Sequence, residues 1–299
     1  MIYDSWMHYI RDDVKMTALV IPGAHNAGSC GMGKMAECQA DSVYTQFCYG
    51  VRQFCLRLST DRRGKLVLAH GLSKGEPLEK VLREFRRILR EFPEEVLLLD
   101  LREYYPQQFG PVTVTYRAAP DAVNALLAAY IDPEQYAYTD FGHISEVTLG
   151  DIKKAGKRFL LINDEEAYAY SKNCDQILPW EKAVNGALAA DFSVETLRFF
   201  DDYTTDGLYW FQTQQTPNPG TPVGLTTPRR LDETLRPYFQ KIIDGIAENP
   251  RYLARANIIA GDFMTLDYAK CAAILRLNLL KGNVVPDWEA EFATGLDGK

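Results

Sequence analysis

The sequence lacks any apolar run approaching the roughly 20 residues that a membrane-spanning helix needs. It also lacks an internal repeat, a low-complexity tract and an excess of basic residues. Its 299 residues contain 33 Lys and Arg against 40 Asp and Glu, a formal net charge of −7. Binding to a polyanionic backbone needs clustered cations, so this balance argues against a nucleic acid as the main partner and against strong adhesion to anionic lipid.

Cysteine is sparse, and no Cys-x-x-Cys pair is present. Four of the six cysteines lie between residues 30 and 55, separated by 8, 10 and 7 positions. Structural zinc sites usually bring paired cysteines two to four residues apart, and disulfide frameworks belong to much shorter chains. We therefore expect all six cysteines (Cys30, Cys38, Cys48, Cys55, Cys174 and Cys271) to be free thiols, buried or in loops.

The first residues, 1–6 (MIYDSW), lack the basic and apolar regions of a signal peptide. We expect no such signal in this sequence, which fits a cytoplasmic protein or a secreted one whose signal has been removed. Hydrophobic residues make up 46% and charged residues 24%, as in ordinary globular proteins. The length suits one α/β barrel domain over residues 1–299, and we expect a monomer.

Short apolar segments alternate with segments of helical periodicity along the chain. The expected strands cover residues 16–21, 51–58, 65–69, 96–101, 159–162, 208–212 and 258–262. The expected helices cover 3–12, 76–92, 121–131, 231–248 and 268–280, and a long loop is expected over 104–120. This alternation predicts a parallel α/β barrel.

Three polar residues stand where expected strands end. His25 follows the first strand in a turn bracketed by Gly23 and Gly28, Arg57 comes at the end of the second strand, and His70 follows the third. Each histidine taken alone could simply be packed or capping. Loops at the carboxyl ends of parallel strands hold the chemistry of α/β enzymes, and together the three residues supply a base, an acid and an anion clamp.

The segments that carry these residues resemble the X-domain family of phosphatidylinositol-specific phospholipases C, in its single-domain bacterial-type branch. The matching segments are WM at 6–7, LVIPGAH at 19–25, GVR at 50–52, LR at 56–57, LAHG at 68–71, PEEVLLL at 93–99, QTQQTPNP at 212–219 and IIAGD at 258–262. The first hundred residues match most specifically, and residues 105–200 do not. The resemblance implies a distorted, incompletely closed TIM-type (β/α)8 barrel.

The resemblance also implies a mechanism. His25 would be the general base on the inositol 2-hydroxyl and His70 the general acid on the diacylglycerol oxygen. Arg57 would stabilise the phosphorane, and Asp262 would orient His25, although Asp262 taken alone would equally suit a helix N-cap. The implied substrate is phosphatidylinositol or a related inositol phospholipid, met transiently at a membrane surface, and the implied products are diacylglycerol and inositol 1,2-cyclic phosphate.

Two positions depart from the bacterial pattern. Asn26 and Cys55 stand where bacterial members have acidic residues, and an amide cannot stabilise an imidazolium as a carboxylate does. The His25-Asn26 pair is that of the calcium-dependent eukaryotic branch, whose calcium ligands correspond here to Asn26 and to the positions of Cys55, Arg57 and Arg102. Calcium requires several oxygen ligands, and two of these positions are cations. We therefore expect no metal and no cofactor, with Arg57 taking the electrostatic role of calcium.

Four further residues are expected to bind the substrate. Arg102 matches a basic residue of the bacterial site, and Asn163 stands where bacterial members place another arginine. Gln212 begins the matched segment at 212–219, and Tyr104 lies near a strand end, where an aromatic ring can cover one face of a sugar.

Two other functions stay open at this point. The first is a catalytically weak protein that binds a head group or glycan on the same barrel, its turnover lost through Asn26 and Cys55. The second is a metal-dependent glycerophosphodiesterase, but the His-Arg-Gly and paired-glutamate ligands of such sites are absent near His25. Turnover of phosphatidylinositol in the presence of EDTA separates an enzyme from a binding protein.

Overall fold

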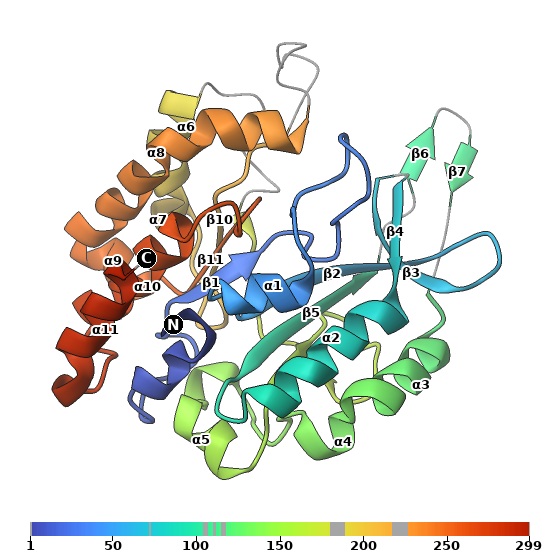
Figure 1. Cartoon of the computed structure of the whole chain (residues 1–299), viewed down its shortest axis with the longest axis horizontal. Coiled ribbons are helices and arrows are strands. Elements are labelled where there is room, and N and C mark those ends of the chain that lie inside the picture. The colour runs from blue at the N-terminus through green and yellow to red at the C-terminus, as the bar shows by residue number, and fades with distance from the viewer. Residues whose placement is uncertain are drawn as a thin grey trace.

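The computed structural model describes residues 2–71, 73–103, 107–109, 112–114, 118–179, 189–216 and 227–298. A curled sheet lies at the centre, and helices such as α2 and α8 cover its outside (Figure 1). The strands are β1 (Ile21–Ala24), β2 (Gln53–Thr60), β3 (Leu66–His70), β4 (Ser73–Pro77), β5 (Leu97–Glu103), β6 (Gln107–Phe109), β7 (Val112–Val114), β8 (Phe159–Ile162), β9 (Ser171–Lys172), β10 (Trp210–Gln212) and β11 (Ile258–Gly261). The α-helices are α1 (Val43–Cys48), α2 (Leu78–Glu91), α3 (Pro120–Ile131), α4 (Pro133–Tyr136), α5 (Leu149–Lys154), α6 (Ala189–Glu195), α7 (Phe199–Asp202), α8 (Pro228–Glu248), α9 (Pro250–Arg255), α10 (Ala269–Leu280) and α11 (Glu289–Asp297).

Seven strands form a parallel series in the order β10-β11-β1-β2-β5-β8-β9. No strand pairing joins the two ends of this series within the described residues. Instead, an isolated parallel bridge joins Ile177, which follows β9, to Tyr209, which directly precedes β10. The α/β class and the incompletely closed barrel expected from the sequence are confirmed.

The register decides which side chains point into the barrel. Residues aligned across neighbouring strands share a face, and alternate residues of one strand share it too. Phe54 lies on the outer face, where its ring packs edge-on against Phe85 of α2 at 5.1 Å. The opposite, inner face of the aligned strands carries the polar set Gln53, Cys55, Arg57, Asp100, Arg102 and Gln212. The interior of the barrel at the level of these residues is therefore polar, which a purely structural core would avoid.

The third expected strand is a departure from the parallel pattern. β3 runs antiparallel to β2 and continues into β4 as a second hairpin, so His70 lies outside the parallel series. β2 extends to Thr60, and Arg57 therefore lies within that strand rather than at its end. The turn over 61–64 explains this geometry, because the Asp61 carboxylate accepts hydrogen bonds from the Arg63 and Lys65 amides at 2.8 and 2.9 Å.

Three other expectations were wrong in detail. The apolar run 16–21 contributes only its last residue to β1, and residues 16–18 form a turn. The Asn257 amide donates to the Met16 and Leu19 carbonyls at 2.7 Å each, which replaces strand pairing there. The helix expected over 3–12 is two short 3-10 helices, Ile2–Asp4 and Trp6–Tyr9. The loop expected over 104–120 contains the hairpin β6–β7.

A buried ion pair anchors the N-terminal segment. Arg52 pairs with Glu95 at 2.6 Å, and both side chains are almost completely inaccessible. The same guanidinium donates to the Tyr3 and Phe47 carbonyls at 3.1 and 2.9 Å. Because unpaired buried charges are costly, these contacts hold the N-terminal 3-10 helix against the first residues of β2.

Neither a long apolar helix nor a disulfide appears in the part of the chain that the structure describes. No helix there is long and apolar enough to cross a membrane. All six cysteines are free thiols, as expected, and four of them are buried.

Candidate active site

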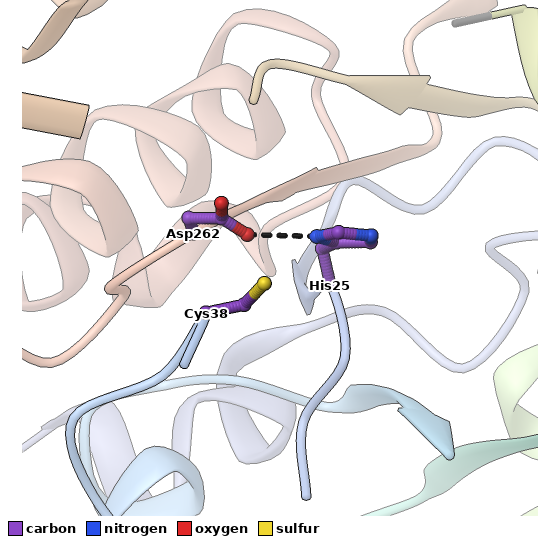
Figure 2. A group of neighbouring side chains, drawn as sticks. All are labelled: His25, Cys38 and Asp262. Atoms are coloured by element: carbon purple, nitrogen blue, oxygen red, sulfur yellow. Dashed lines mark hydrogen bonds and ion pairs between the residues drawn. The ribbon is translucent and has the colours of Figure 1, made fainter. Parts of the chain in front are cut away.

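His25 and Asp262 lie side by side at the carboxyl ends of two neighbouring core strands. β1 and β11 pair in parallel, and His25 and Asp262 are the residues that directly follow them. His25 Nδ1 lies 2.7 Å from Asp262 Oδ1, and both side chains are at least nine-tenths buried. Figure 2 shows the carboxyl group pointing at the imidazole ring. The pairing expected between these residues is therefore present in the structure.

Burial favours the uncharged form of both His25 and Asp262. It lowers the pKa of His25 well below the ordinary value, with Arg57 and Arg102 adding to the effect. Burial and nearby Asp232 raise the pKa of Asp262, while Lys270 opposes the rise. The imidazole of His25 is therefore neutral near pH 7.

Arg57 reaches the other side of the His25 ring. Its Nη2 lies 3.2 Å from His25 Nε2. Arg57 is aligned with Arg102 of β5, so the two guanidinium groups project from adjacent strands into the barrel. An anion in this mouth would meet two cations and an imidazole.

His70 faces His25 from the β3–β4 hairpin. The two ring centroids are 6.2 Å apart, with the rings nearly perpendicular at 84°. His70 Nδ1 lies 2.8 Å from the Ala36 carbonyl, which can only accept, so Nδ1 carries a proton. Burial, together with His25 and Arg57, lowers the pKa of His70 to about 4. The two histidines expected from the sequence are thus brought together, but on elements of different kinds.

No hydrogen bond joins Asn26 to His70 among the described residues. Its Nδ2 faces Cys38 Sγ at 3.5 Å, and its Oδ1 is buried with no hydrogen-bond partner among the described residues. Cys38 Sγ in turn lies 3.6 Å from His70 Nδ1. A buried thiol thus lies between the Asn26 amide and the His70 ring.

Arg102 is held on the inner wall by a buried carboxylate. Its Nε donates to Asp100 Oδ2 at 2.5 Å, and its guanidinium lies 5.1 Å from the centre of the Trp210 ring. Gln176 Nε2 bridges Asp100 and Asp164 at 3.3 and 2.7 Å. Nη2 of Arg102 is buried without a partner among the described residues. Asp100 therefore offsets the charge of Arg102 and leaves Nη2 able to donate to a bound group.

The remaining expected substrate residues differ in their surroundings. The Asn163 amide donates to the Leu101 carbonyl at 2.7 Å and its oxygen accepts from the Ala167 amide at 2.9 Å, so both ends bond to the backbone. Gln212 points into the barrel, where its Nε2 has no partner among the described residues. Tyr104 lies outside the described residues. A substrate contact by any of the three stays a prediction.

A network of buried charges supports the turn that carries Asp262. Lys270 Nζ donates to the Asp262 carbonyl at 2.7 Å and also pairs with Asp232. Arg236 pairs with Asp232 at 2.7 Å and donates to the Phe263 carbonyl at 3.0 Å. Phe263 has a left-handed φ of 48°, so this turn is one that ordinary residues seldom adopt. Hydrogen bonds from Lys270 and Arg236 to the Asp262 and Phe263 carbonyls stabilise this turn.

Several of these residues carry no signal in the sequence. Cys38 and Gln39 sit in a loop without periodicity, and Gln39 Nε2 ties the His25 and Gly261 carbonyls together at 2.9 Å each. Asp100 lies inside an apolar strand, and only its position two residues before Arg102 would suggest a shared face. Gln176 could be found only from the fold.

One set of side chains has the arrangement of metal ligands. Within the described residues, His25, Cys38 and Asp262 bring one ligand atom each to within 4.8 Å of one another. The expectation that catalysis uses no metal stays a prediction.

Solved structures similar to this one share its fold. The phosphatidylinositol-specific phospholipase C from Listeria monocytogenes matches with a TM-score of 0.65 and 18% identity, over 92% of this chain and 98% of its own. That from Staphylococcus aureus, with pentafluoro-Phe incorporated, matches with a TM-score of 0.66 and 16% identity, over 94% and 98%. No protein-family model matches the sequence, and no curated protein is similar to it in sequence. The chain therefore has the fold of the bacterial phosphatidylinositol-specific phospholipases C, which confirms the resemblance at the level of the fold.

Proposed function

We propose that this protein is a phospholipase C that cleaves phosphatidylinositol, or a related inositol phospholipid, without a metal ion. The observation that carries the proposal is the opposed pair of imidazoles, His25 and His70, with Arg57 beside the first of them. A base, an acid and a cation placed around one mouth match the needs of phosphodiester cleavage. The enzymes whose fold the chain shares are phosphatidylinositol-specific phospholipases C.

His25 acts as the general base. Its Nδ1–H donates to Asp262, so Nε2 is the nitrogen that accepts a proton. The substrate phosphate draws the Arg57 guanidinium away from Nε2, and the inositol 2-hydroxyl takes its place. As Nε2 removes the hydroxyl proton, the oxygen forms a bond to phosphorus. Because the nucleophile already belongs to the substrate, the step gains a large effective molarity.

His70 acts as the general acid. Its Nδ1–H is held by the Ala36 carbonyl, so Nε2 delivers the proton. A nearby phosphate anion favours the protonated ring, and substrate binding therefore raises the low pKa that burial imposes on the unliganded enzyme. The bond from phosphorus to the diacylglycerol oxygen breaks as that oxygen takes the proton. The products are diacylglycerol and inositol 1,2-cyclic phosphate.

The arginines neutralise the phosphorane. Within the described residues no carboxylate is paired with Arg57, whereas Arg102 is paired with Asp100. We assign the non-bridging oxygens to Arg57 and a positioning contact, through Nη2, to Arg102. The substrate is a lipid, so the protein acts transiently at a membrane surface, as one domain and as a monomer.

The test is turnover of phosphatidylinositol vesicles with EDTA present, followed by phosphorus NMR of the product. We expect a cyclic phosphate signal, unchanged turnover in EDTA and no stimulation by calcium. His25→Ala, prepared in the same way, controls for contaminating activity. A strict calcium requirement, or a non-cyclic phosphate as the first product, would show that the mechanism is wrong.

A weak head-group binding protein is the second candidate. It is favoured by one observation: among the described residues, no carboxylate is hydrogen-bonded to His70, whose partners are a carbonyl and a thiol. Calorimetry with inositol phosphate decides between the two. Binding without any turnover would favour this second function.

A further inference from the structure

The cluster of His25, Cys38 and Asp262 has a donor set that the proposed chemistry does not use in full. The three side chains come from the turn after β1, the following loop and the turn after β11. All three are buried, and Figure 2 shows the Cys38 sulfur directed toward the Asp262–His25 pair. A base and its carboxylate need no thiol.

The backbone holds Cys38 firmly in this position. Its amide donates to Ser29 Oγ at 2.9 Å, and its carbonyl accepts from the Phe263 amide at 2.7 Å. The second bond links the Cys38 loop directly to the turn that carries Asp262. The three ligand atoms are thus fixed with respect to one another before any ion arrives.

A fourth donor lies beside the cluster. Asn26 is 3% exposed, and its Oδ1 has no hydrogen-bond partner among the described residues. Its amide group faces Cys38 Sγ. Rotation of this amide by half a turn would present a neutral oxygen to an ion bound at the thiolate.

This donor set selects a particular class of ion. Thiolate, imidazole and carboxylate together suit Zn²⁺, which takes four ligands in a tetrahedron. Calcium and magnesium need oxygen ligands in larger number and bind thiolates poorly. The cluster therefore differs in chemistry from a calcium site.

We propose that His25, Cys38 and Asp262 form an inhibitory site for Zn²⁺ or another thiophilic divalent cation. The ion bonds to His25 Nδ1, Cys38 Sγ and an Asp262 carboxylate oxygen, and the hydrogen bond between His25 and Asp262 is lost. The Cys38 thiol releases its proton to solvent. The imidazole proton moves from Nδ1 to Nε2, the atom that must accept the proton of the inositol hydroxyl. The inhibitory part of this inference rests on the proposed function; the binding part does not.

Direct metal binding is the first test. The protein is stripped with EDTA, freed of chelator and titrated with Zn²⁺ against a chromophoric chelator, and with Cd²⁺ while the thiolate-to-cadmium absorption is followed. We expect one equivalent to bind, slowly because Cys38 is 1% exposed. Cys38→Ala should abolish the cadmium band and weaken zinc binding by more than the roughly 10- to 100-fold that loss of an outer-shell partner of a metal site costs.

Two variants control for other thiols. Cys271→Ala removes a thiol that is as buried but lies on the outer helix α10, and Cys30→Ala removes a more accessible thiol of the same loop. Both should bind like the parent protein, and melting curves check that each variant is folded. Absence of stoichiometric binding in the parent protein, or equal binding by folded Cys38→Ala, would overturn the inference and leave the proposed function untouched.

Inhibition is the second test. Zn²⁺ should suppress turnover of phosphatidylinositol, EDTA should restore it, and Cys38→Ala should resist zinc when each rate is divided by its own metal-free rate. Zinc bound through Cys38 without loss of turnover would refute an inhibitory role. If no preparation turns over phosphatidylinositol, the proposed function fails, and the cadmium band still decides whether the site exists.

Discussion

The two histidines of the site are held by different kinds of structure. His25 follows a core strand that pairs with β11 on one side and β2 on the other, and its ring is hydrogen-bonded to a carboxylate. His70 ends a hairpin strand outside the parallel series, and its ring is hydrogen-bonded to a loop carbonyl. The base is thus placed by the centre of the fold, and the acid by its periphery.

This contrast extends to the residues behind each histidine. Behind Asp262 lies the buried network of Lys270, Asp232 and Arg236. Behind His70 lies the loop that carries Ala36 and Cys38, which is held by hydrogen bonds between neutral groups rather than by ion pairs. Loss of a buried charged partner on the base side should therefore cost more folding stability than loss of a hydrogen bond on the acid side.

The largest expected effect comes from removing each histidine. His25→Ala and His70→Ala should each lower kcat on the lipid by roughly 10² to 10⁴, the usual worth of one acid or base. An inositol ester with an aryl leaving group needs no proton on that oxygen. It should rescue His70→Ala and leave His25→Ala inactive, measured as kcat on the two substrates.

Equal rescue of both variants would mean that the two roles are assigned wrongly. Arg57→Lys is a useful companion, because an ammonium cannot replace the planar fork of a guanidinium. It should lose turnover on both substrates alike, since both pass through the same phosphorane.

The second largest effect tests the two supports. Lys270→Met removes one of the two cationic partners of Asp232 and the donor to the Asp262 carbonyl, and should cost about 2 to 3 kcal/mol in the free energy of unfolding because buried polar groups lose their hydrogen bonds. On the hairpin side, Lys74 donates to Ser59 Oγ at 2.5 Å and is half-buried. Lys74→Met should cost about 1 kcal/mol. Denaturant unfolding of both variants measures the difference, and equal costs would contradict the contrast drawn between the two sides.

The sequence predicted the base side better than the acid side, for a physical reason. His25 comes soon after one short apolar run and Asp262 ends another, and parallel neighbours bring their strand ends together without further information. His70 also follows an apolar run, but the Asp61 turn converts that run into a hairpin strand. A local apolar pattern does not distinguish the two cases.

Contacts made by loops could not be predicted from the sequence, because a local pattern does not determine the path of a loop. Cys38 contacts His70 and Asn26 through a loop whose path depends on a hydrogen bond that the Cys38 amide donates to Ser29 and one that its carbonyl accepts from Phe263. Nothing in the spacing of these residues predicts that path. The run 16–21 shows the opposite error. It was predicted to be a strand, but the Asn257 side chain, far along the chain, donates to its backbone carbonyls in place of strand pairing.

The third effect concerns stability against pH. Burial lowers the pKa of His70 to about 4, against about 6.5 in the unfolded chain. Between these values the unfolded chain binds more protons, so stability rises with pH from 4 to 6.5 and is complete above. With EDTA present, His70→Gln should remove roughly 3 kcal/mol of this dependence. Urea unfolding at pH 4.5 and 7.5 measures it, and an unchanged slope would show that His70 is not buried as neutral imidazole.

The smallest expected effect, and the one that sharpens the comparison most, is that of Asn26→Asp. Asn26 has a left-handed φ of 45°, which aspartate tolerates, so the fold should be kept. A carboxylate here would lie beside Cys38, which contacts His70. It should raise the pKa of His70 by about one unit and increase turnover. The alkaline limb of the kcat/KM profile should then move about one pH unit toward neutral, so that kcat/KM on that limb rises about tenfold. Asn26→Ala, which removes the amide without adding charge, is the matched control and should leave the limb in place. If Asn26→Asp melts like the parent protein and its limb does not move, the amide rather than a carboxylate is the partner that this site requires.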